Sequence, residues 1–124
     1  MQKDNIVFED KNSKVTFNHY SFCELVKWIM VKYCKTTYEN ANTIVEKSRL
    51  YEEPKSYFEA CLMTHELPFH WAMLLFHGDM YWLKGIPSDY NEFEEEYQIW
   101  EAKIIRQHKL KAPYQYEVYN QLDG

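Results

Sequence analysis

Residues 69–82, with the sequence FHWAMLLFHGDMYW, decide the fold because they are apolar around most of a helical turn. Helices of this kind are buried in a core or against a partner. At about 14 residues the segment is too short to cross a membrane, which needs about 20. Pro68 precedes it, and a Gly85-Ile86-Pro87 loop follows it. We therefore predict a helix over 69–82 at the centre of the fold.

Apolar spacing predicts four further helices, over 21–35, 38–50, 54–65 and 89–110. The residues expected at their starts are a Ser21–Glu24 capping box, Thr36-Thr37, Pro54 in a first turn, and Ser88 or Asp89. In the first of these helices, Glu24 and Lys27 fall on the side opposite the apolar residues. The last helix has a continuous apolar seam formed by Phe93, Tyr97, Trp100, Ile104 and His108.

Residues 5–8 and 14–18 are β-branched and aromatic, and a polar turn separates them. They predict a β-hairpin over 5–18, which must pack on another element because two strands alone are marginal in water. The tail, 113–124, alternates between apolar and polar residues and is expected to form a third strand or an ordered extension. We predict a mainly α, single-domain fold over 1–124, a compact bundle of about five helices over 21–111 with a short N-terminal hairpin.

Charge and cysteine content restrict the partners and the compartment. Lys and Arg number 14 and Asp and Glu 19, and residues 63–124 carry the whole net charge of −5. That balance makes nucleic acid an unlikely partner, and no apolar run is long enough to suggest a membrane. The three cysteines, Cys23, Cys34 and Cys61, are odd in number and widely spaced, and the N-terminus has no secretory signal. We therefore expect reduced thiols in the cytoplasm.

The histidines offer a metal or catalytic alternative. His65 and His70 flank Glu66, but they are five residues apart with Pro68 between them, whereas the zinc-protease motif needs two histidines four apart on one helix. A small metal-binding protein or enzyme would use Cys61, His65, His70 and His77. A fourth metal ligand and an oxyanion hole are both unidentified, so the leading prediction includes no metal, cofactor or catalytic residue.

Acidic and aromatic residues carry the leading functional prediction. The chain has 11 Tyr, 7 Phe and 4 Trp, too many for a core of this size, so some must be displayed where a partner protein binds. The residues predicted to contact a partner are Glu92, Glu95, Glu96, Tyr81 and Trp82. The glutamates either receive Lys and Arg from that partner, or imitate phosphates, or simply oppose the helix dipole on a solvated face.

The function predicted on this basis is that of an inhibitor, adaptor or immunity-type factor. A further alternative is a homo-oligomeric structural subunit, whose aromatic surface is covered by its own copy. The stretch from Ser48 to Trp82, with Thr64–Ala72 at its centre, resembles small proteins of bacteria and mobile elements. This resemblance implies a bacterial or phage origin and assigns no functional residue.

Overall fold

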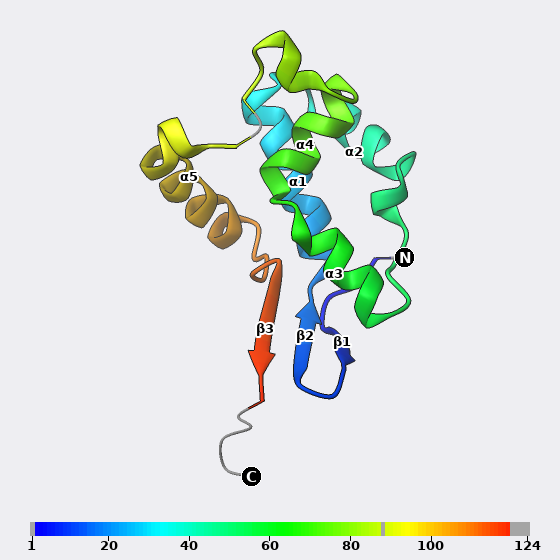
Figure 1. The fold of residues 1–124 in the computed structure, drawn as a ribbon. Helices are drawn as coiled ribbons and strands as arrows, with labels where there is room; N and C mark the ends of the chain where they lie inside the picture. Colours follow the sequence, from blue (N-terminus) through cyan, green and yellow to red (C-terminus); the bar gives the residue numbers. More distant parts are fainter. Residues whose placement is uncertain (1, 88, 120–124) are drawn as a thin grey trace.

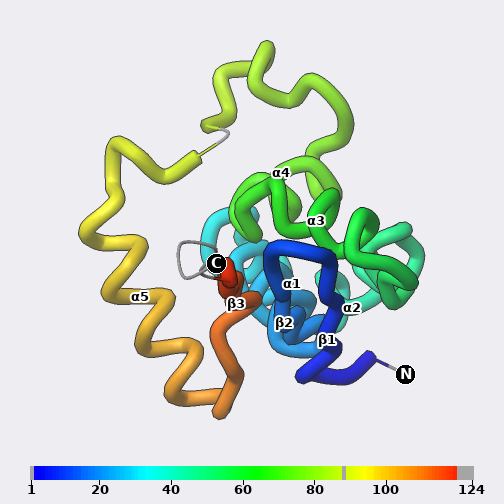
Figure 2. The backbone as a smooth tube through the Cα atoms, turned by 60° about the horizontal axis from the view of Figure 1, so that its bottom comes forward, coloured from blue at the N-terminus to red at the C-terminus, as the bar shows by residue number. Residues whose placement is uncertain are grey.

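Helix α1 (His19–Tyr33) runs through the middle of the molecule in the computed structural model, which describes residues 2–87 and 89–119. Figure 2 shows it between α5 (Glu94–Gln107) on one side and α2 (Tyr38–Glu46) on the other. Ten of its 15 residues are buried, including Glu24 and Lys27. The sequence pattern had placed these two charged residues opposite the apolar face, so it did not predict their burial.

The two buried charged residues of α1 form an ion pair, and the carboxylate of that pair accepts a further hydrogen bond. The Lys27 ammonium donates to Glu24 Oε2 at 2.6 Å, and the Tyr38 hydroxyl donates to Glu24 Oε1 at 2.8 Å. Tyr38 is held at the start of α2 because the Thr37 side chain caps that helix, as predicted, by accepting from the Asn40 backbone N–H. A charged pair is tolerated in a protein interior when it is closely paired and hydrogen-bonded in this way.

The start of α1 differs from the predicted capping box. The helix begins at His19, and Ser21 lies inside it. The Ser21 hydroxyl donates to the Asp4 carboxylate at 2.8 Å and accepts from the Lys111 backbone N–H at 2.9 Å. Asn18, just before the helix, donates from its side chain to the Ala112 carbonyl at 2.7 Å. The predicted capping box was therefore wrong. The side chains of Asn18 and Ser21 instead form hydrogen bonds with residues far away in the sequence, Ala112 and Lys111.

Helix α4 (Pro68–His77) packs against α1 and gives the core Phe69, Ala72 and Met73. The prediction of a continuous helix to Trp82 was wrong beyond residue 77. Gly78 takes a positive φ of 88°, a conformation that glycine adopts without steric cost, and it ends the helix. The chain then turns back and forms a short 3-10 helix, η2 (Tyr81–Lys84).

The remaining helices begin later or end earlier than predicted. Helix α2 ends at Glu46 and is followed by η1 (Arg49–Tyr51). Helix α3 (Tyr57–His65) begins after Ser56, whose side chain accepts from the Glu59 backbone N–H, so this serine and not Pro54 sets the start. Helix α5 follows a 3-10 turn, η3 (Asn91–Phe93).

The three strands form one antiparallel sheet in the order β1 (Ile6–Glu9), β2 (Ser13–Phe17) and β3 (Tyr114–Val118). The predicted hairpin is confirmed, and residues 114–118 of the predicted tail form the third strand (Figure 1), while 120–124 lie outside the described residues. Val15 is buried opposite Phe8 and Tyr116, on the face where α3 packs. The Tyr116 hydroxyl is 2.8 Å from that of Thr64 on α3.

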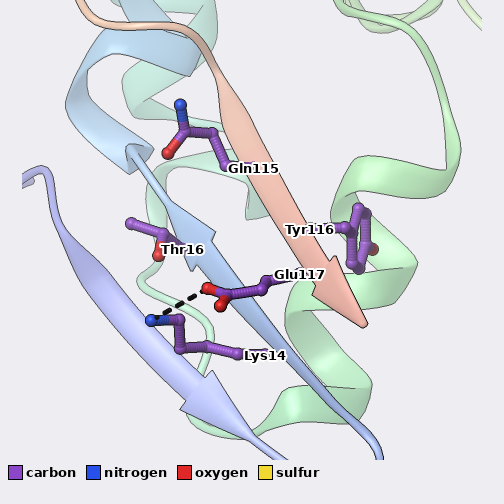
Figure 3. A pocket seen from close by; sticks show the side chains of 5 residues that line it. All are labelled: Lys14, Thr16, Gln115, Tyr116 and Glu117. Atoms are coloured by element: carbon purple, nitrogen blue, oxygen red, sulfur yellow. Dashed lines mark ion pairs between the residues drawn. The ribbon is translucent and has the colours of Figure 1, made fainter. Parts of the chain in front are cut away.

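The opposite face of the sheet is polar, as Figure 3 shows, with Tyr116 pointing away from it. Lys14 Nζ lies 3.3 Å from Glu117 Oε2 there, beside Thr16 and Gln115, over a hollow of about 440 Å³. The predicted fold class, a mainly α single domain with a small N-terminal sheet, is confirmed. Within residues 2–87 and 89–119, no helix combines the length and the hydropathy that crossing a membrane requires.

Candidate functional site

The beginning of α5 carries a cluster of exposed carboxylates. Glu92 lies in η3, and Glu95 and Glu96 lie in the first turn of α5. These residues border a hollow of about 600 Å³. Its lining, which we call the acidic hollow, consists of Asn91, Glu92, Phe93, Glu94, Glu95, Glu96 and Ile99. Three of the five residues predicted to contact a partner therefore lie together.

The apolar seam of α5 explains why these carboxylates face outward. Tyr97 is buried, and the rings of Phe93 and Trp100 lie 5.5 and 5.6 Å from the ring of Tyr33 on α1. With 3.6 residues per turn, holding this seam against α1 turns Glu92, Glu95 and Ile99 to the opposite side and leaves Glu96 at the flank. The predicted seam is confirmed.

The carboxylates of the acidic hollow remain without a cation in the part of the chain that the structure describes. No ion pair joins Glu92, Glu95 or Glu96 to a Lys, Arg or His there. Burial, and secondarily the negative charge of Glu96, raise the pKa of the Tyr33 hydroxyl, which stays protonated behind the cluster. The three carboxylates also lie at the N-terminal end of α5, where the positive end of the helix dipole attracts negative charge.

The two aromatic residues of the predicted site are placed differently from each other. Tyr81 is fully buried, whereas 47% of Trp82 is exposed. The Tyr81 hydroxyl lies 2.7 Å from His70 Nδ1 because the turn after α4 folds the chain back onto that helix. Burial raises the pKa of Tyr81 to about 12, so the phenol keeps its proton. Tyr81 thus supports α4 from inside, and Trp82, with Leu83 beside it at 71% exposed, is the aromatic residue available at the surface.

The structure does not bring the residues of the metal or catalytic alternative together into one site. Cys61 accepts a hydrogen bond from Tyr116, and His77 lies 3.8 Å from the Cys34 sulfur. His70 is paired with Tyr81, while His65 is exposed. In residues 2–87 and 89–119, no three His, Cys, Asp or Glu side chains come close enough to share a metal ion.

Burial raises the pKa of the two more enclosed cysteines. The value rises to about 12 for Cys23 and to about 11 for Cys34. Both groups are therefore protonated thiols at neutral pH, and the protonated thiol is a poor nucleophile. The contact between Cys34 and His77 consequently lacks the thiolate that a nucleophilic cysteine needs.

Sequence reasoning missed four residues of the acidic hollow, Asn91, Phe93, Glu94 and Ile99, and Ile99 is the exposed apolar one among them. Its side chain is 66% exposed and lies among the glutamates. A signal was present, since Ile99 is a large aliphatic residue three and four positions after Glu96 and Glu95 and off the apolar seam. Large side chains of this kind at the centre of a charged ring are typical of protein-binding surfaces.

Comparison with known proteins finds no matching family model, curated protein or solved structure. The case for a function therefore comes from the residues themselves. The acidic hollow combines three features: exposed carboxylates, an exposed apolar side chain one helical turn beyond Glu95 and Glu96, and a helix whose inner face packs on α1.

Proposed function

We propose that this protein acts by binding another protein through the acidic hollow at the start of α5. In this proposal it is an inhibitor, adaptor or immunity-type factor that works in the cytoplasm of a bacterium or in phage infection. The observation that carries the proposal is the exposure of Ile99 amid Glu92, Glu95 and Glu96, which have no neutralising cation in the described residues.

The charge of the acidic hollow specifies the chemistry of the partner. Carboxylates attract Lys and Arg during encounter and raise the association rate, while the apolar centre supplies contact area once solvent is displaced. The partner surface is therefore basic, with an apolar side chain that packs on Ile99. Trp82 on η2 offers further exposed aromatic area of the kind that interfaces use.

The rigidity of α5 supports this use of its outer face. The helix is fixed by the packing of its seam against Tyr33, so a partner need not order the glutamates by folding the helix. Binding to a preorganised surface avoids part of the entropy cost of association. The glutamates on this helix are thus suited to a rapid, salt-sensitive encounter.

The test is affinity capture from native cytosol, with binding then measured against the captured partner. The variant replaces Glu92, Glu95 and Glu96 with Gln, which removes three charges and keeps the side-chain size. We expect this variant to bind at least tenfold more weakly at low salt, with a flatter dependence of affinity on salt concentration.

A matched control changes the same number of charges elsewhere. Glu39, Glu46 and Glu117 are exposed and lie on α2 and β3, so their replacement with Gln removes three charges without touching the acidic hollow. This control is expected to bind the partner as the unchanged protein does. If both triple variants bind equally weakly, the effect comes from the overall charge of the protein and not from the acidic hollow. If the first variant binds as the unchanged protein does, the acidic hollow is not the binding surface.

A further inference from the structure

A second cavity lies on the other side of the molecule, between η1, α3 and the first turns of α4. Its volume is about 750 Å³, within the range of pockets that hold small molecules. Part of its lining is apolar, with Leu62 and Met63 on α3 and Trp71 and Leu74 on α4. None of its lining residues belongs to the acidic hollow.

Trp71 forms a fixed part of the cavity wall. It is only 6% exposed, and its indole N–H donates to the Met63 carbonyl at 2.9 Å, which locks the ring in one orientation. The Arg49 guanidinium lies 5.8 Å from the centre of the ring, so this wall already attracts one cation to the aromatic face. The methylene groups of a ligand would find a preformed apolar surface on Trp71 and Met63.

The charges around the cavity have a negative excess. The lining contains four carboxylates, from Glu52, Glu53, Glu59 and Glu66, and two permanent cations, from Arg49 and Lys55. Counted without the histidines, the formal net charge of the lining is −2. Lys3, 3.9 Å from Glu53, is exposed and offsets this excess weakly. A recess with low-dielectric walls concentrates such a field, so it favours a cation over an anion.

His70 makes no direct hydrogen bond to the nearest carboxylate of this cavity, that of Glu66. Its Nδ1 lies 2.7 Å from the Tyr81 hydroxyl, and its Nε2 points toward Glu66. That nitrogen lies 3.9 Å from Glu66 Oε2, beyond a direct hydrogen bond. The Glu66 carboxylate is therefore left with acceptor capacity beside the cavity.

We propose that this cavity binds a small aliphatic amine. Its ammonium group is attracted by the carboxylates of Glu52, Glu59 and Glu66, which line the cavity without converging on one point, and its alkyl chain lies against Met63 and Trp71. The ligand is recognised by two features together, a positive head group and an apolar body of a few carbon atoms. This site is independent of the partner-binding function proposed for α5.

The experiment titrates the whole protein with hexylamine, hexanoate and hexanol and follows the four indole N–H resonances by NMR. Hexylammonium is expected to bind saturably and to shift the Trp71 resonance, assigned with a Trp71→Phe variant. The anion and the alcohol, which share the alkyl chain, are expected to bind at least tenfold more weakly. Equal binding of all three ligands, or the lack of saturable binding of hexylamine, would overturn the proposal.

Matched variants test the role of the carboxylates. Replacing Glu52 and Glu66 with Gln is expected to weaken hexylamine binding about tenfold, because two charged partners of the ammonium become neutral. Replacing Glu95 and Glu96 with Gln removes the same charge far from the cavity and is expected to leave the affinity within about twofold at 0.15 M salt. Both variants are compared by thermal unfolding to verify that they fold. Retention of full affinity by the first variant would also overturn the proposal, while leaving the proposed function of α5 untouched.

Discussion

Helices α1 and α5 use glutamate in opposite ways. Glu24 is buried in α1, where Lys27 and Tyr38 both donate to its carboxylate. Glu95 on α5 is exposed, and no cation pairs with it in the described residues. The difference arises from the neighbouring element, since α2 covers one side of α1 and nothing described covers the outer side of α5. A carboxylate on a helix thus takes part in the packing of the fold in one region and stays exposed in the other, where we propose that a partner binds.

The largest effect is expected from Lys27→Met. This change leaves Glu24 buried without its cation, and breaking a buried pair in this way typically costs about 3–5 kcal/mol of unfolding free energy. Urea unfolding followed by circular dichroism measures the loss. Adding Glu24→Gln to the same chain removes the isolated charge and should restore part of the stability. A loss below about 1 kcal/mol for Lys27→Met would mean that the Lys27–Glu24 pair contributes no more to stability than a surface ion pair does.

A smaller effect is expected from Tyr38→Phe. The change removes the hydroxyl that donates to both Glu24 oxygens, at 2.8 and 3.0 Å, and keeps the ring that packs on Trp28. A hydrogen bond to a charged group contributes about 1.5–3 kcal/mol, so the unfolding free energy should fall by that amount. Tyr20→Phe, an exposed residue on the same helix as Glu24, is the control and should change stability by less than about 0.5 kcal/mol.

The smallest effect is expected from replacing Glu92, Glu95 and Glu96 with Gln. The lost attraction to the helix dipole is offset by relief of repulsion among the three carboxylates, so the unfolding free energy should change by about 0.5 kcal/mol or less. The same urea titration measures it. A loss comparable to that of Lys27→Met would mean that the two regions do not differ in the way the contacts imply.

Periodicity predicted the parts of the fold that depend on one segment alone. The seam of α5 follows from apolar residues spaced three and four apart, and the hairpin follows from two β-branched stretches around a polar turn. The outward position of Glu92 and Glu95 follows from the same seam, so this part of the candidate site was also predictable. Ile99 was predictable for the same reason and was overlooked.

Features that depend on distant segments were not predictable. Ser21 matches a local capping pattern, but in the folded chain its hydroxyl donates to the Asp4 carboxylate and accepts from the Lys111 backbone N–H. The burial of Glu24 depends on Tyr38, which comes from another helix. Tyr81 is buried because the turn at Gly78 folds it back onto His70, whereas an unbroken helix would have carried it onward. In each case a contact with another segment of the chain, and not the local sequence pattern, determines where the residue lies.

Segments from near the two ends of the chain pair in the sheet, so the sheet can be completed only late in synthesis. Asn18 bonds to Ala112 across 94 positions, and β2 pairs with β3 just beyond it. While the ribosome is still making α5, β2 therefore has one open edge, which is the kind of edge to which other chains add. The native sheet is completed only when residue 118 has emerged and β3 has docked on β2, after which the open edge on that side belongs to β3.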